Sequence, residues 1–157
     1  ERRFHVADNS VLAGMYTGEM NAETLEEISA FMTENKAEYA DKKLILYGNI
    51  PGLAYYLDKP PAIYTTWADL DTSSLSQLQK ELQEIASSLG EEGQERPLVI
   101  LTPQLAAYLS HNADAMAWWG TDEEECDRDK KLEAIQAFME MGAYEQVFAN
   151  EAFVIYE

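Results

Sequence analysis

The run Leu44-Ile45-Leu46-Tyr47 constrains the fold more than any other stretch of this chain. All four residues are apolar, so a strand formed by them would have to bury both of its faces. Strands of that kind belong to parallel or mixed sheets that carry helices on each side. Residues 97–102 form a second apolar run of the same character. We therefore predict an α/β domain in which the rest of the chain covers this sheet.

Glycine, proline and capping residues divide the remaining sequence into alternating elements. We predict further strands over 11–17 and 62–65, and a hairpin from 144–149 and 152–156. Helices are predicted over 23–36 with Asn21 as N-cap, over 52–57, over 75–89 capped by Ser73 or Ser74, from Pro103, and around 132–142. This alternation predicts a three-layer, Rossmann-like sandwich with a mostly parallel sheet and a C-terminal antiparallel hairpin.

The length and the net charge of the chain restrict the kinds of protein to which it can belong. A chain of 157 residues fits one domain, which we place at 11–157 with 1–10 as a lead-in or linker. The net charge of −18 argues against binding to nucleic acid or to anionic lipid. No stretch approaches the roughly 20 apolar residues that span a bilayer. The chain begins with Glu1 and not with an initiator Met, so we expect it to be a piece of a longer protein.

Three turns are expected at the carboxyl ends of strands, where open α/β sheets bind their ligands: 48–52, 65–71 and 102–103. In the first turn, Gly48, Asn49 and Gly52 could direct backbone N–H groups at a phosphate or carboxylate. The turn lacks G-x-G-x-x-G and the lysine of a phosphate-binding loop. The alternative interpretation is a strand-to-helix turn that needs glycine for its backbone geometry.

The second turn carries Asp69 and Asp71 in a D-x-D pattern, which could share a divalent cation and through it a nucleotide-sugar diphosphate. The alternative is a turn and helix-capping role. Trp67 in the same turn is a candidate contact for carbohydrate or protein, or else a core residue. Our main prediction contains no cofactor, no metal site and no catalytic residue.

Other constellations lack a recognisable pattern. The acidic run at residues 123–129 does not have the spacing of an EF-hand loop. His111 and the single cysteine, Cys126, could form a base and nucleophile, but no local motif supports the pair. The sequence has no Cys/His set for zinc and no G-x-S-x-G elbow.

One resemblance is carried by the residues LYGNIPGL at 46–53, Pro60-Pro61-Ala62 and WADLD at 67–71. They resemble the soluble segment that follows the transmembrane helices of bacterial multi-pass glycosyltransferase-like proteins of the dolichyl-phosphate-mannose and aminoarabinose transferase type. The resemblance covers residues 43–71 and, more loosely, 147–157. In that family the catalytic carboxylates lie between membrane helices, so no catalytic residue is carried over.

The resemblance implies a non-catalytic, extracytoplasmic accessory domain that upstream transmembrane segments tether to the cell membrane. Its implied partners are the membrane-embedded region of its parent chain and a glycan or lipid-linked sugar, with no nucleic acid. Two alternatives stay open from the residues themselves. One is a small enzyme that binds a nucleotide-sugar or sugar phosphate through a D-x-D metal site, and the other is an acidic protein-interaction module.

Overall fold

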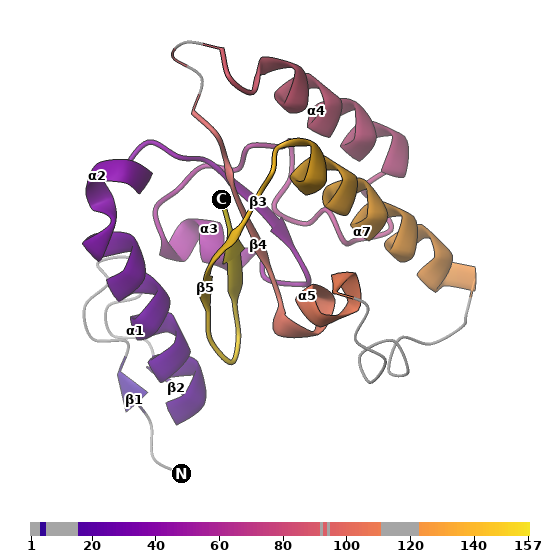
Figure 1. Ribbon diagram of the computed structural model, residues 1–157. Helices are drawn as coiled ribbons and strands as arrows, with labels where there is room; N and C mark the ends of the chain where they lie inside the picture. Colours follow the sequence, from indigo (N-terminus) through magenta and orange to yellow (C-terminus); the bar gives the residue numbers. More distant parts are fainter. Residues whose placement is uncertain (1–3, 6–15, 92, 94, 111–122) are drawn as a thin grey trace.

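The computed structural model describes residues 4–5, 16–91, 93, 95–110 and 123–157. These residues form an α/β fold, which confirms the predicted class (Figure 1). The elements are β1 (Phe4–His5), β2 (Tyr16–Thr17), α1 (Glu19–Glu34), α2 (Lys36–Tyr39), β3 (Leu44–Tyr47), α3 (Gly52–Tyr56), α4 (Leu75–Ser88), β4 (Leu98–Leu101), α5 (Pro103–Leu109), α7 (Glu123–Met141), β5 (Gln146–Ala149) and β6 (Val154–Tyr156). Within these ranges, no helix is long and apolar enough to cross a membrane.

The main sheet is mixed, so the prediction of a mostly parallel sheet is wrong. Its strand order is β3-β4-β6-β5. Strands β3 and β4 are parallel, from Leu44 opposite Leu98 to Tyr47 opposite Leu101. Strand β6 is antiparallel to both of its neighbours, β4 and β5. The predicted C-terminal hairpin is therefore confirmed, but its second strand enters the sheet beside β4 and makes two of the three strand pairs antiparallel.

The strand predicted over 62–65 is also wrong. This segment makes only a single parallel bridge, in which Leu44 donates to the Pro60 carbonyl and accepts from the Ala62 N–H. Pro60 and Pro61 have no N–H to donate, so the ladder cannot be continued through them. Of the strand predicted over 11–17, Tyr16–Thr17 forms β2 and pairs with β1, while 11–15 lie outside the described residues.

Helix ends follow the predicted caps in one case and depart from them in another. Ser74 is the N-cap of α4 and its hydroxyl accepts from the Gln77 N–H at 3.1 Å, as predicted. Helix α1 begins earlier than predicted, with Gly18 as its N-cap. Asn21 lies inside the first turn, and its amide donates to the Thr17 hydroxyl at 3.3 Å. The prediction of Asn21 as N-cap is wrong, because the backbone is already helical there.

Helix α7 begins at Glu123, about nine residues before the predicted start, so the acidic run forms its first turns. Negative side chains favour the amino end of a helix because they complement its dipole. The segment from residue 123 to the predicted helix around 132–142 is therefore helical as well. His111 and the Trp118-Trp119 pair lie outside the described residues.

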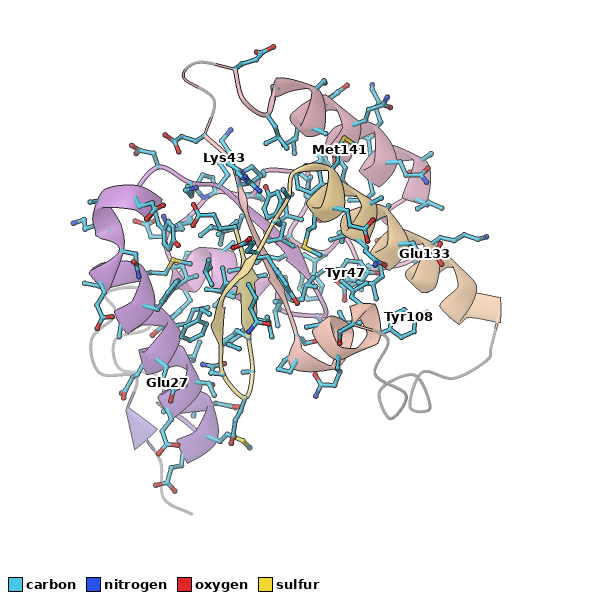
Figure 2. All side chains as sticks on the ribbon, in the orientation of Figure 1. Glu27, Lys43, Tyr47, Tyr108, Glu133 and Met141 are labelled. Atoms are coloured by element: carbon cyan, nitrogen blue, oxygen red, sulfur yellow. The ribbon has the colours of Figure 1, made fainter. Side chains whose placement is uncertain are left out.

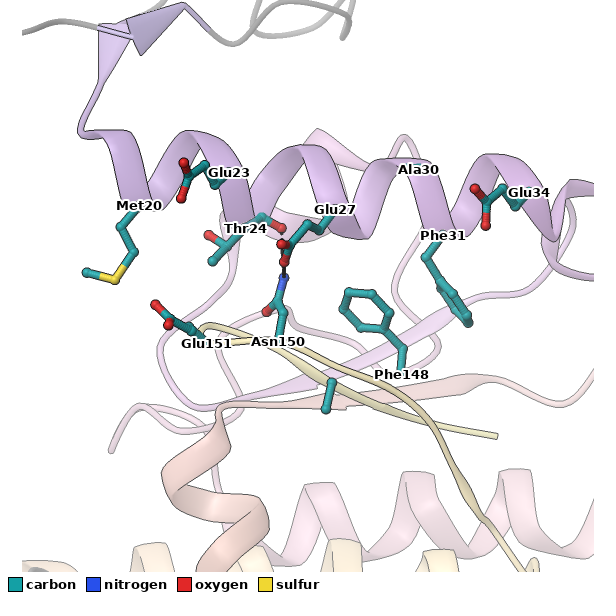
Figure 3. A pocket seen from close by; sticks show the side chains of 11 residues that line it. Met20, Glu23, Thr24, Glu27, Ala30, Phe31, Glu34, Phe148, Asn150 and Glu151 are labelled. Atoms are coloured by element: carbon teal, nitrogen blue, oxygen red, sulfur yellow. Dashed lines mark hydrogen bonds between the residues drawn. The ribbon is translucent and has the colours of Figure 1, made fainter.

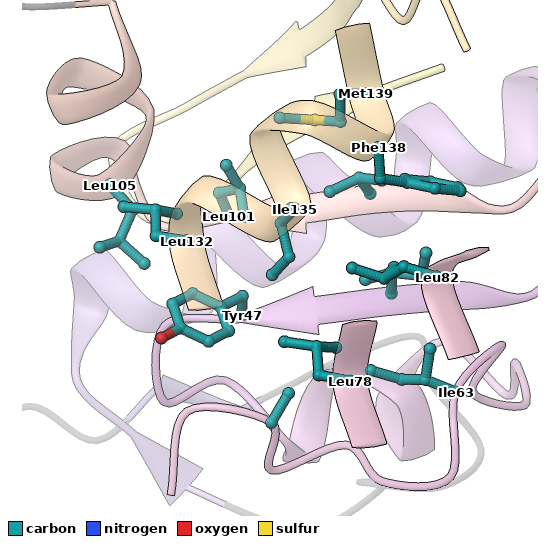
Figure 4. Close-up of a cluster of buried hydrophobic side chains, with 13 residues drawn as sticks. Tyr47, Ile63, Leu78, Leu82, Leu101, Leu105, Leu132, Ile135, Phe138 and Met139 are labelled. Carbon is teal, nitrogen blue, oxygen red and sulfur yellow. The ribbon is translucent and has the colours of Figure 1, made fainter. Parts of the chain in front are cut away.

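Side chains fill the space between the helices and the main sheet (Figure 2). Alternate residues of β3 belong to two separate cores, one on each face of the sheet. Leu44 and Leu46 pack with residues of α1, α2 and α3 on one face. Ile45 and Tyr47 pack on the other face with residues of α4, α5 and α7, where Leu105 and Leu132 lie close to Tyr47 (Figure 4). This alternation is the period-two geometry of a strand buried on both sides.

A cluster of charged and polar side chains lies at the amino end of β3. We call it the Lys42 cluster, consisting of Tyr39, Lys42 and Glu157. The Lys42 side chain is only 6% exposed, and its Nζ lies 2.5 Å from Glu157 Oε1. The Tyr39 hydroxyl donates to Glu157 Oε2 at 2.8 Å. Both carboxylate oxygens are therefore hydrogen-bonded, which offsets the free energy lost when the charges leave water.

The pKa values follow from this arrangement. Burial raises the pKa of the Glu157 carboxyl, but hydrogen bonds from Lys42 and Tyr39 outweigh it and hold the pKa below its ordinary value. Burial, and next the hydrogen bond to Glu157, raise the pKa of the Tyr39 hydroxyl. The cluster is therefore most favourable with an ionised carboxylate and a neutral phenol.

Candidate functional site

The parallel register of β3 and β4 places the turns that follow them side by side. Gly48, directly after β3, has a φ of +115°. A Cβ at this position would lie 2.8 Å from Leu105 Cδ1 and 2.9 Å from Thr102 Cγ2. Both the backbone conformation and the close approach therefore require glycine. The structure thus brings together two of the three predicted turns, 48–52 and 102–103.

The other two candidates in the first turn are open to solvent. Asn49 is exposed and adopts a φ of 60°, a left-handed conformation that asparagine tolerates better than most residues. Gly52 begins α3, and a Cβ added there would meet no atom within 4 Å. Helix α3 has only five residues, so little dipole accumulates along it. Anion binding by this turn stays a prediction.

The remaining predicted turn, 65–71, presents large side chains to solvent. We call residues 64–71 the aromatic loop. Tyr64 is 88% exposed, Trp67 44% and Leu70 41%, so three large apolar or aromatic side chains lie outward on one short segment. Ala68, in contrast, is fully buried in the core against α4 and α7. Trp67 is thus a surface residue and not a core residue.

Hydrogen bonds fix the backbone of the aromatic loop. Lys131 of α7 is only 3% exposed, and its Nζ donates to the Leu70 carbonyl at 2.8 Å. The Trp67 N–H donates to the Thr65 hydroxyl at 2.9 Å. The backbone of the loop is therefore anchored to α7 at Leu70 and by its own turn at Trp67.

Lys131 was not among the residues predicted for this site. A signal for it exists in the sequence, since Lys131, Ile135 and Phe138 have the spacing i, i+4 and i+7 that places them on one helix face. Leu132 and Met139 extend the same apolar stripe. A lysine within that stripe must be buried and needs an acceptor.

The two carboxylates of the D-x-D pattern have different surroundings. Asp69 is partly buried, and its Oδ1 is inaccessible to solvent without a hydrogen-bond partner among the described residues. Asp71 is exposed. The described ranges contain no group of three or more His, Cys, Asp or Glu side chains placed to hold a metal ion. The aromatic loop therefore contains one buried acceptor, Asp69 Oδ1, without a donor among the described residues. It also contains one carboxylate that is open to solvent, that of Asp71.

No protein-family model, no curated protein and no solved structure matches this chain.

Proposed function

We propose that this chain is a non-catalytic accessory domain that contacts a glycan or lipid-linked sugar through the aromatic loop. The observation that carries the proposal is the exposure of Tyr64, Trp67 and Leu70 on one anchored segment. An isolated exposed apolar side chain needs no explanation, but three on one fixed loop form a surface suited to a partner.

The chemistry of the aromatic loop fits a sugar. Tyrosine and tryptophan combine an apolar ring face with a polar tip, so they can stack on the C–H face of a sugar ring and still bind water or a hydroxyl. Asp69 and Asp71 lie beside Trp67 in the sequence and accept hydrogen bonds from hydroxyl or amino groups. Asp71 is exposed, so its carboxylate is the one that a sugar can reach from solvent.

The cellular context of the proposal rests on the resemblance. We infer that the domain has a Rossmann-like arrangement and lies outside the cytoplasm, attached to the membrane through segments upstream of Glu1. The membrane-embedded part of the same parent chain would then be its neighbour. The test is the reading frame upstream of residue 1: several hydrophobic segments of about 20 residues are expected. A frame that encodes none of them would refute this part of the proposal.

The binding proposal can be tested with Trp67 as the only tryptophan, in a Trp118→Phe/Trp119→Phe background. Its emission is followed during titration with a neutral oligosaccharide, an amino-sugar oligosaccharide and a detergent-dispersed polyprenyl-phosphate sugar. We expect a saturable change with at least one of them. In calorimetry, the natural sequence should bind the same sugar, and the variant Trp67→Ala should not bind it. Tyr55→Ala, which removes an exposed tyrosine on α3, should bind it as the natural sequence does.

Two results would contradict the proposal that the aromatic loop binds a sugar. If none of the three sugars changes the Trp67 emission at millimolar concentration, or if Trp67→Ala binds as tightly as the natural sequence, the aromatic loop is not a sugar site. The D-x-D alternative is tested in the same series by adding Mn²⁺ with a nucleotide-sugar. A rise in melting temperature that Asp69→Ala/Asp71→Ala abolishes would favour that enzyme.

A further inference from the structure

A second surface lies at the opposite edge of the main sheet from β3, in a groove of about 580 Å³ between α1 and β5 (Figure 3). One wall is the side of α1 that faces β5, and the other is β5 with the start of the hairpin turn. The groove is independent of the aromatic loop, which follows β3 at the far edge.

The backbone of β5 is available for pairing on this side. Glu145 and Glu157 exchange both of their N–H to carbonyl hydrogen bonds, and the Asn150 N–H donates to the Phe153 carbonyl. In an antiparallel pair, such residues alternate with residues whose N–H and carbonyl point away from the partner strand. The register of β5 shifts between Gln146 and Phe148, so the alternation is counted separately from each end of the strand. It directs the backbone groups of Gln146 and of Ala149 away from β6. Among the described residues, no strand lies beyond β5 to receive them.

Apolar side chains line the groove at two places. The rings of Phe31 from α1 and Phe148 from β5 meet with their centroids 4.9 Å apart. Both are only partly buried, and Ala30 lies next to them in the lining. Met20 at the start of α1 is exposed at the second place. An occupant therefore needs apolar side chains on one of its faces.

The rim of the groove is acidic. Glu23, Glu27 and Glu34 from α1 and Glu151 from the hairpin turn contribute to the lining, and none of its described residues is a lysine or arginine. Glu27 accepts a hydrogen bond from the Asn150 amide at 3.0 Å. The other three carboxylates make no ion pair with any described residue. Charge complementarity therefore requires a cationic occupant, and it excludes nucleic acid and anionic lipid.

We propose that the β5 edge binds an extended basic peptide segment by strand addition. The peptide pairs its backbone with β5 near Ala149, directs one set of alternate side chains at Phe31 and Phe148, and places lysine or arginine near the glutamates. The lengths agree: α1 from Met20 to Glu34 rises about 21 Å, and seven residues of strand extend about 23 Å. Peptide addition between an edge strand and a helix is an established mode of recognition.

The test uses the whole chain and a blocked heptapeptide of alternating valine and lysine with a fluorescent label. We expect saturable anisotropy at low salt, with the largest amide NMR changes in β5. Glu23→Lys/Glu34→Lys should weaken binding at least tenfold. The matched control Glu91→Lys/Glu133→Lys makes the same change in net charge at exposed positions outside the groove and should alter binding less than twofold.

Two N-methylated peptides separate strand addition from simple charge attraction. Methyl groups on the alternate nitrogens that face β5 should abolish binding, whereas methyl groups on the other alternate set should leave it within about threefold. A peptide of the same composition arranged with helical periodicity should bind at least tenfold more weakly. Equal loss with the two methylated peptides, tighter binding of the helical peptide, or no effect of the groove double variant would each overturn the proposal.

Discussion

The Lys42 cluster and the aromatic loop lie at opposite ends of β3 and treat polar groups in opposite ways. In the Lys42 cluster, both carboxylate oxygens of Glu157 are hydrogen-bonded, the Lys42 side chain is buried, and the Glu157 side chain is 20% exposed. In the aromatic loop, the Asp69 Oδ1 atom is removed from water without a hydrogen-bond partner among the described residues, while Trp67 lies exposed. The first arrangement stabilises the fold, whereas the second leaves a free-energy penalty in the folded chain.

From this difference we expect mutations in the Lys42 cluster to affect stability and mutations in the aromatic loop to affect binding. Removing one member of a satisfied buried pair leaves the other member uncompensated. Removing an unsatisfied acceptor relieves a free-energy penalty instead. The predictions below test this contrast, from the largest expected effect to the smallest.

The largest effect is expected at Lys42. Lys42→Met should lower the free energy of unfolding by about 3 kcal/mol, because Glu157 would lose its buried cation. The measurement is urea unfolding at pH 7. The control is Lys80→Met, which breaks an exposed pair with Glu84 at 3.9 Å and should change stability by less than about 0.5 kcal/mol. Similar losses in the two variants would mean that the Lys42 cluster is no stronger than a surface pair.

The second effect is expected at the turn after β3. Gly48→Ala should lower the free energy of unfolding by about 2 kcal/mol, because the backbone is left-handed and a Cβ would collide with Thr102 and Leu105. Gly52→Ala provides the control at the other end of the turn, where space is open. It should leave stability unchanged or raise it by up to about 1 kcal/mol. Equal melting temperatures for both variants would contradict the packing at Gly48.

The third test is the pH dependence of the Lys42 cluster. The pKa of Glu157 lies below its ordinary value of 4.5 in the folded chain, so the unfolded chain binds this proton more readily. The resulting stability is fully present above pH 4.5 and is lost as the pH falls through the lower, folded value. The difference in unfolding free energy between the natural sequence and Lys42→Met should therefore shrink between pH 6 and pH 3. A difference that stayed constant over this range would show that Glu157 does not supply it.

The smallest effect is expected in the aromatic loop. Asp69→Ala should raise the free energy of unfolding by about 0.5 to 1 kcal/mol, because it removes a desolvated oxygen without a partner. Asp71→Ala, at an exposed position, should have no effect on stability. Thermal unfolding of both variants measures this. A loss of more than about 1 kcal/mol in Asp69→Ala would assign Asp69 to the structure and remove it from the proposed sugar site.

The sequence alone determined the features that depend on neighbouring residues. Leu44–Tyr47 and Leu98–Leu101 are buried strands because an apolar run without alternation fits only a strand covered on both faces. Ser74 caps α4 because a serine hydroxyl reaches an N–H three residues ahead. The hairpin of β5 and β6 needs only a short turn, and Trp67, Asp69 and Asp71 were identifiable as neighbours in one loop.

The tertiary structure decided what depends on residues far apart in the chain. The insertion of β6 beside β4 cannot be read from either strand, because parallel and antiparallel neighbours satisfy the same apolar pattern. Lys42 meets Glu157 across 115 positions, and Lys131 meets Leu70 across 61. No local period encodes such pairs, since a buried cation needs an acceptor but does not specify which one. The burial of Asp69 Oδ1, which has no hydrogen-bond partner among the described residues, likewise exists only once the chain has folded around it.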